Sequence, residues 1–228
     1  MIPLTYTYLT LSILFFCAWL LLFISFPKIR REMFFISIGS GLVGLIFQTA
    51  YLTDWWNTPT FTGTRFGLED YLFNFSICGI GAVLYEIVLK KVTPQLSLNQ
   101  LKEKILQPGS IFVLLAPVIT FLILFYFASV NSLLATVGGF SVPILFIWLK
   151  NSNLITRSLV SAVFLLCAVF VIYNIVSVIS PEFNTLWFFE FNGQKISYFN
   201  VPLEDIIGFA FVGMYVGPLY TYVTSNKK

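Results

Sequence analysis

The chain has 228 residues, of which 58% are hydrophobic and only 10% are charged, and its mean hydropathy is +0.88. Soluble domains carry about 25% charged residues, so this composition excludes an ordinary soluble protein and indicates a polytopic membrane protein. A formal net charge of +3 gives no indication of nucleic-acid binding. The absence of His removes the commonest metal ligand, and three isolated cysteines have no metal-ligand spacing. We therefore expect no metal site and no cysteine-based site.

Seven apolar stretches have the length of about 20 residues that a transmembrane helix needs. They run near 4–26, 33–52, 67–89, 110–129, 131–149, 157–179 and 202–223. Between the third and fourth, residues 96–106 place leucine and isoleucine on one face beside two lysines, which favours a short interfacial helix. A solvated linker is the alternative for that segment.

Basic residues are segregated to one side of these spans. One side has eleven of them: Lys28, Arg30, Arg31, Lys90, Lys91, Lys102, Lys104, Lys150, Arg157, Lys227 and Lys228. The other side has only Arg65 and Lys195. Since basic loops stay in the cytoplasm, we expect a multi-pass protein of the cell membrane, with its N-terminus outside and its C-terminus in the cytoplasm.

An acidic pair recurs at the start of two predicted spans. The motif "GLED" at residues 67–70 lies 135 positions (202 − 67) before "PLED" at residues 202–205. Each motif follows a tryptophan-containing loop, "TDWWN" or "TLWFFEFN", and the span before each loop contains one amide, Gln48 or Asn174. These matches indicate an internal duplication.

The duplication predicts an all-α membrane fold with two three-helix repeats. The first repeat comprises residues 1–90 and the second residues 131–228, and residues 91–130 supply the interfacial segment and a connecting transmembrane helix. Because three spans reverse the direction of the chain and the connecting span restores it, the repeats are expected to be parallel.

The four acids Glu69, Asp70, Glu204 and Asp205 have two interpretations. A helix N-terminus favours negative charge by about 0.3–1 kcal/mol, and Pro202 suits a first helical turn, so the pairs can simply mark helix starts. Capping needs one acid, however, and each copy has two. Ionisable residues at membrane depth are costly and typically functional. A neutral carboxylic acid beside a carboxylate is what general acid–base catalysis requires.

Aromatic residues surround both pairs in the sequence. An aromatic belt at the membrane interface is one explanation, and a hydrocarbon pocket whose ring faces stabilise a cation is the other. Under the second explanation, the candidate substrate-binding residues are Trp56, Trp187, Phe188, Phe66, Asn174 and Gln48.

Other polar and small residues receive structural interpretations. Glu86 lies four residues before Lys90, which is typical of a helical ion pair. Asn74 and Asn131 are expected to form hydrogen bonds between helices. Glycines in two spans predict faces where helices approach closely, namely Gly39, Gly41, Gly44, Gly213 and Gly217.

These motifs resemble the lycopene cyclase domain family, the cofactor-independent carotenoid cyclases of the membrane. The similarity is most specific at two acids opening a span and at their duplicated counterparts. It comprises Pro202, Glu204 and Asp205, then Glu69 and Asp70, and the preceding Trp56-Asn57 and Trp187-Phe188. The sequence differs from the family pattern in having Gly67 in place of proline, and Gln48 and Asn174 where an aspartate is common.

The resemblance implies a lycopene β-cyclase, an intramolecular lyase of isomerase type without net redox change. An acid would protonate the terminal double bond of a linear carotene, the carbocation would close to a six-membered ring, and a base would remove a proton. It implies Glu204 and Asp205 as acid and base, with Glu69 and Asp70 as their partners. It further implies a carotenoid substrate dissolved in the bilayer, and other carotenoid-synthesis enzymes as partners.

Two other functions are compatible with the sequence. A non-catalytic membrane protein that binds carotenoids or other isoprenoids would hold its pigment unchanged. A small proton- or cation-coupled transporter would use the acids as a relay. A retinal photoreceptor is disfavoured, because residues 202–223 contain no lysine for a Schiff base.

Overall fold

The computed structural model describes residues 2–65, 67–94, 96–187, 190 and 194–225. This part of the chain has seven helices that are long and apolar enough to cross a membrane. They are α1 (Leu4–Ser25), α2 (Arg30–Asp54), α3 (Leu68–Leu89), α5 (Pro108–Leu122) with its π-helical continuation to Phe127, α6 (Ser132–Lys150), α7 (Leu154–Ile179) and α8 (Leu203–Ser225). Each coincides with a predicted span, which confirms a helical, multi-pass membrane protein.

Shorter elements connect the spans. The 3₁₀ turn η1 (Pro27–Ile29) precedes α2, the π-helical turn η2 (Ile123–Phe127) extends α5, and the 3₁₀ turn η3 (Pro181–Leu186) follows α7. The strands β1 (Ser197–Tyr198) and β2 (Val201–Pro202) form a hairpin before α8. The predicted interfacial segment is α4 (Leu98–Ile105), whose start is fixed because Ser97 Oγ accepts a hydrogen bond from the backbone N–H of Gln100.

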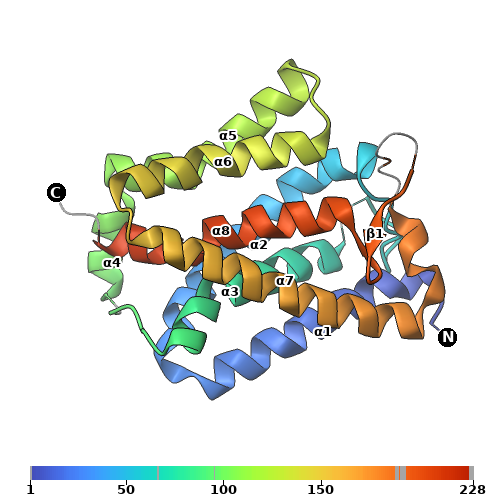
Figure 1. Ribbon diagram of the computed structural model, residues 1–228, viewed down its shortest axis with the longest axis horizontal. Coiled ribbons are helices and arrows are strands. Elements are labelled where there is room, and N and C mark those ends of the chain that lie inside the picture. The colour runs from blue at the N-terminus through green and yellow to red at the C-terminus, as the bar shows by residue number, and fades with distance from the viewer. Residues whose placement is uncertain (1, 66, 95, 188–189, 191–193, 226–228) are drawn as a thin grey trace.

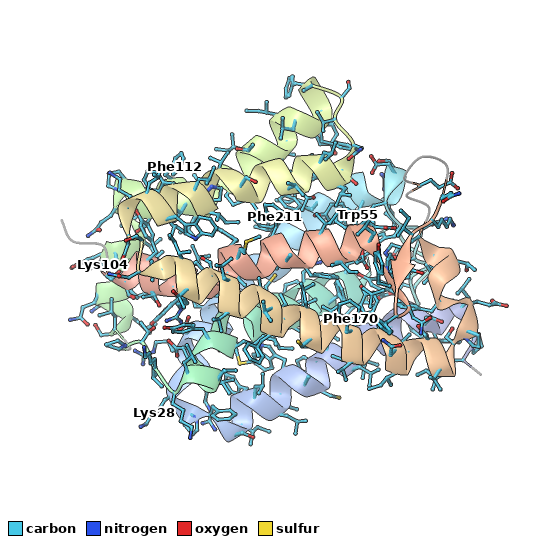
Figure 2. All side chains as sticks on the ribbon, in the orientation of Figure 1. Lys28, Trp55, Lys104, Phe112, Phe170 and Phe211 are labelled. Atoms are coloured by element: carbon cyan, nitrogen blue, oxygen red, sulfur yellow. The ribbon has the colours of Figure 1, made fainter. Side chains whose placement is uncertain are left out.

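The helices α3 and α8 lie at the centre of the bundle and pack against each other. Helices α1 and α2 flank α3, whereas α6 and α7 flank α8, and α5 packs on the outside against α6 (Figure 1). Helix α1 begins at the end opposite to α4, and α8 ends at the α4 end (Figure 1). Lys28 and Lys104 lie toward that same α4 end, far from Trp55 (Figure 2). This arrangement agrees with the predicted segregation of charge.

The packing of α7 against α8 depends on small residues. A Cβ atom added to Gly213 would lie 2.6 Å from the Cα atom of Ala162, which is inside van der Waals contact. A Cβ atom added to Gly217 would lie 2.5 Å from the Cβ atom of Ser161. The prediction of a small-residue face on α8 is therefore confirmed, and the two backbones approach closely because that face has no side chains.

Arg157 on α7 is buried at the α4 end and connects three other helices. Its Nη2 donates hydrogen bonds of 2.9 Å to the Oε1 atoms of Glu32 on α2 and Glu86 on α3. Its Nε donates to the Gly217 carbonyl on α8 at 2.7 Å, and its Nη1 donates to Thr93 Oγ1 at 2.8 Å. The predicted pair of Glu86 with Lys90 is therefore wrong. Glu86 is buried, and a buried carboxylate is stabilised more by the equally buried guanidinium of Arg157 than by a lysine that stays in solvent.

Two local expectations also differ from the structure. Asn131 does not join helices but caps α6, since its Oδ1 accepts a 2.8 Å hydrogen bond from the backbone N–H of Leu134. Pro202 lies in β2, one residue before α8, rather than within the first helical turn. Its ring still fixes the entry of the chain into the helix.

We predict that Arg157→Ala lowers the free energy of unfolding by about 3–5 kcal/mol, because it leaves two buried carboxyl groups without their cation. Thermal unfolding of the purified protein in detergent measures the change. Lys91→Ala is the control, since Lys91 is exposed. Equal unfolding temperatures for the two variants would contradict the role given to Arg157.

Candidate functional site

The two acidic pairs lie in the first turns of α3 and α8, at the end of the bundle opposite to α4. All four side chains are buried, and the most accessible of them, Glu204, is 3% exposed. The described part of the chain contains no ion pair to any of the four. Carboxyl groups so desolvated depend on hydrogen bonds from neighbouring donors.

Asp205 is held by donors from two different helices. The indole N–H of Trp55, at the end of α2, donates to Asp205 Oδ1 at 2.8 Å. The hydroxyl of Tyr173 on α7 donates to Asp205 Oδ2 at 2.7 Å. Both carboxyl oxygens therefore accept a hydrogen bond, and neither donor comes from the first turn of α8. Asp205 therefore forms no capping hydrogen bond, and it lies in the first turn of α8, where the helix dipole also favours its charge.

Asp70 combines a structural role with an unused oxygen. Its Oδ2 accepts a 2.8 Å hydrogen bond from the backbone N–H of Gly67 and so caps α3, as the first interpretation of the pairs expects. Its Oδ1 is buried and has no hydrogen-bond partner among the described residues. The buried hydroxyl of Tyr8 on α1 faces the Asp70 carboxyl and interacts with it, beyond the length of a normal hydrogen bond.

The two glutamates face the outer loops instead. Glu69 Oε1 accepts a 2.5 Å hydrogen bond from the backbone N–H of Phe61, which holds the loop before α3. Glu204 lies within the electrostatic influence of Lys195, in the segment before β1. The aspartate of each pair is thus directed into the bundle. The glutamate of each pair interacts with a loop, Glu69 through a hydrogen bond and Glu204 through the charge of Lys195.

The tryptophan loops pair with each other across the bundle. Trp56 and Trp187 form an isolated antiparallel bridge, and their ring centroids are 6.2 Å apart in an edge-to-face arrangement. The backbone N–H of Asn57 donates to the Leu186 carbonyl at 2.8 Å. Gln48 is buried below this bridge, where its Oε1 accepts a 3.2 Å hydrogen bond from the indole N–H of Trp56. Three predicted site residues are therefore brought together.

The remaining predicted residues do not join the acids. Asn174 is only half-buried, and it anchors the hairpin turn before α8, bonding the Phe199 carbonyl and the Asn200 side chain. The prediction that Asn174 is a buried amide at the site is wrong, because its helix face points to that turn. Phe66 and Phe188 lie outside the described residues.

Buried aromatic rings enclose the carboxyl groups. Consecutive rings lie within 6.3 Å of each other, centroid to centroid, on α1, α3, α7, α8 and the tryptophan loops. They are Tyr8, Trp55, Trp56, Phe73, Tyr173, Phe183, Trp187 and Phe209. Two of these residues, Tyr8 and Tyr173, place hydroxyl groups at the site, and no sequence motif identified them. The only indication in the sequence is that each is a tyrosine in the half of a predicted span nearer the acidic motifs.

A cavity of about 400 Å³ lies next to this cluster, between α2, α3, α5, α6 and α8. Its lining is mostly apolar, and it includes none of the four acids. Tyr51 lines its outer end, and the Tyr51 ring packs against the Trp55 ring with centroids 4.7 Å apart. Since Trp55 also bonds Asp205, two aromatic rings separate the cavity from the nearest carboxyl group.

The arrangement lends itself to proton transfer. Among the residues that the structure describes, no group of three or more His, Cys, Asp or Glu side chains is placed to hold a metal ion. Carboxyl and phenol groups from four helices lie among buried aromatic rings. Such groups exchange protons with a bound molecule when one of them has a free oxygen.

We predict that Trp55→Phe costs about 1.5–3 kcal/mol of unfolding free energy, because it removes a hydrogen bond to a carboxylate and keeps the ring. Trp148→Phe is a matched control, since its indole N–H donates to the neutral hydroxyl of Ser158 at 2.9 Å, a bond worth about 0.5–1.5 kcal/mol. Chemical denaturation in mixed micelles compares the two variants. A loss no larger in Trp55→Phe than in Trp148→Phe would show that the bond to Asp205 is not special.

Comparison with protein-family models, with curated protein sequences and with solved structures finds no match to this chain. The chemistry of the site itself is therefore the basis for a functional proposal.

Proposed function

We propose that the protein is a carotenoid cyclase of the lycopene type, which closes the end group of a linear carotene by acid–base catalysis. The observation that carries the proposal is that Asp70 and Asp205, on different helices, are both buried beside one cluster of aromatic rings, in which Phe73 and Phe209 link α3 and α8 just after their first turns. An enclosure of this kind is matched to a carbocation, since ring faces attract positive charge and exclude the water that would capture it.

The reaction needs one proton donor and one proton acceptor. The donor adds a proton to the terminal C=C bond, and the resulting cation is attacked by the neighbouring C=C bond, which closes the ring. The acceptor then removes a proton from a ring carbon, so the new double bond forms and no electrons are gained or lost. We assign the donor role to Asp70, whose Oδ1 is unbonded, and the acceptor role to Asp205, with Glu69 and Glu204 positioning the loops.

The packing of the helices supports the proposed duplication. In the first half α3 is flanked by α1 and α2, and in the second half α8 is flanked by α6 and α7. The contact between α3 and α8 and the bridge between Trp56 and Trp187 both join equivalent parts of the two halves. A parallel pair of three-helix repeats accounts for all of these contacts.

A proton- or cation-coupled transporter is less well supported. Asp70 and Glu86 mark the two polar ends of α3, and the sixteen helical steps from one to the other correspond to about 24 Å. The cavity that lies alongside is lined mainly by apolar side chains. A relay for ions would need polar groups along that distance.

We also propose that the N-terminus lies outside the cell and the C-terminus in the cytoplasm. The support is the segregation of eleven basic residues from two in the sequence. The acidic site then faces the outer half of the membrane.

The functional test is expression in a lycopene-producing bacterium, followed by chromatography of the pigments. The protein is expected to convert lycopene to a cyclic carotene. Asp205→Asn and Asp70→Asn are each expected to lower conversion by about 100-fold or more, the usual contribution of one general acid or base. Unchanged lycopene, with the wild-type protein detected in the membrane, would overturn the proposal.

Glu182→Gln is the matched control for this experiment. Glu182 is an exposed acid in η3, at the same end of the bundle, and it should retain full conversion. Glu86→Gln is not a suitable control, because Glu86 bonds the buried Arg157 and its loss affects folding. If Glu182→Gln abolished conversion as well, the effect of the aspartates would not be specific.

The orientation is tested separately with single cysteines and a membrane-impermeant thiol reagent. In a protein without other cysteines, Glu182→Cys should react in intact cells, whereas Lys91→Cys should react only after permeabilisation. Both positions are exposed. The opposite pattern would reverse the proposed topology.

A further inference from the structure

The cavity beside α2 is long and narrow. Its lining residues on α2 extend from Phe35 to Tyr51, and sixteen helical steps correspond to about 24 Å. The axis of α2 crosses the membrane, so the cavity runs parallel to the bilayer normal. A volume of about 400 Å³ spread over this length describes a groove rather than a compact chamber.

The groove opens sideways toward the bilayer. Helices α2 and α5 form its two edges. They touch near the Tyr51 end, where the Phe47 ring stacks on the Phe121 ring with centroids 4.1 Å apart, so the opening lies nearer the start of α2. Ile38 and Gly39, on the α2 edge, are exposed, and a Cβ atom added to Gly39 would meet nothing within 4 Å. A molecule dissolved in the lipid therefore reaches the groove without crossing water.

The opposite wall is shaped by a proline. Pro117 in α5 has no N–H, so the carbonyl of Val113, four residues earlier, lacks its helical partner. Tyr215 on α8 supplies it, since its hydroxyl donates to the Val113 carbonyl at 2.9 Å. This bond fastens α5 to α8 across the floor of the groove, and it leaves the lining almost free of unsatisfied polar groups.

We propose that this groove binds the linear hydrocarbon chain of the substrate, with the reacting end directed at Tyr51. The inference rests on the proposed function and adds the place where the chain is held. A narrow, apolar, laterally open groove fits an extended polyene chain and offers no polar contact for a headgroup. Tyr51 and Trp55 then separate the bound end from Asp205, so we infer that these two rings move aside when the end group enters the carboxyl site.

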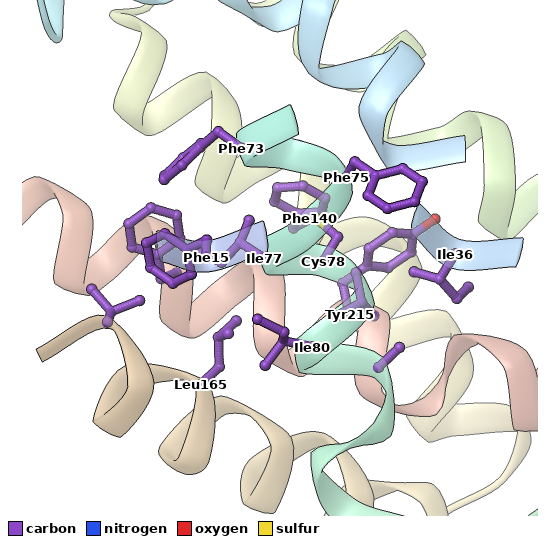
Figure 3. Close-up of a cluster of buried hydrophobic side chains, with 14 of the residues drawn as sticks. Phe15, Ile36, Phe73, Phe75, Ile77, Cys78, Ile80, Phe140, Leu165 and Tyr215 are labelled. Carbon is purple, nitrogen blue, oxygen red and sulfur yellow. The ribbon is translucent and has the colours of Figure 1, made fainter. Parts of the chain in front are cut away.

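Cys78 provides a direct probe of the groove. It is a buried lining residue on α3, and Figure 3 shows it beside Phe140, Tyr215 and Ile36. The other cysteines, Cys17 and Cys167, are exposed on the outside of the bundle and can be replaced by alanine. The experiment measures the rate at which N-ethylmaleimide modifies Cys78 in nanodiscs with and without lycopene.

Bound lycopene should slow the modification of Cys78 by the factor 1 + [L]/Kd, about tenfold when lycopene is at ten times its Kd. Gly39→Trp, which fills the groove at its open edge, should abolish this protection. Leu42→Trp is the matched control, because Leu42 lies on the same helix, is 57% exposed and does not line the groove. It should leave the protection unchanged.

The outcomes separate this inference from the proposed function. Protection of Cys78 that persists in Asp205→Asn supports the groove, even if wild-type protein leaves lycopene unconverted and the cyclase proposal fails. Conversion of lycopene without protection of Cys78 overturns the groove and leaves the cyclase proposal standing. Protection by phospholipid alone, with no further effect of lycopene, would show that an acyl chain occupies the groove and would also overturn the inference.

Discussion

The bundle depends on the ion pairs and hydrogen bonds that the buried guanidinium of Arg157 forms with three other helices. A bilayer offers no water to satisfy a charge, so each buried ionic group must find its partners within the protein. Arg157 reaches two carboxylates and a backbone carbonyl on α2, α3 and α8 from its own place on α7. These bonds fix the angle and register of four helices at one end of the bundle. The residues at the other end are therefore not required to hold the helices together.

At the end of the bundle opposite to α4, the buried carboxyl groups are held without a cation. Asp205 is satisfied by an indole and a phenol, and Asp70 by one backbone amide, so the local charge is not neutralised. An arginine paired with these acids, or apolar residues of similar volume in their place, would make the folded protein more stable. The two ends of one bundle therefore hold their buried carboxyl groups in different ways, one with a guanidinium and the other with neutral hydrogen-bond donors.

Much of the architecture is readable from the sequence, because membrane spans depend on length and hydropathy alone. The seven helices, α4 and the glycine face of α8 follow from such local properties. The partners of Glu86 and Asn174 do not, because a long-range contact competes with the nearest residue of suitable charge or polarity. The same reason explains why the sequence did not identify the groups that contact the acids, namely the indole of Trp55 and the hydroxyls of Tyr8 and Tyr173. These groups come near the acids only when four helices pack together.

The hydrogen bond from Trp55 to Asp205 joins residues 150 positions apart, and this has a consequence for biosynthesis. During translation, the first three spans enter the membrane long before α7 and α8 exist. Until then, Glu32 and Glu86 lack Arg157, and Trp55 lacks Asp205. The first half of the chain is thus an incomplete intermediate that matures only when the last span has been inserted, so truncation from the C-terminal end should be far more damaging than the modest length removed would suggest.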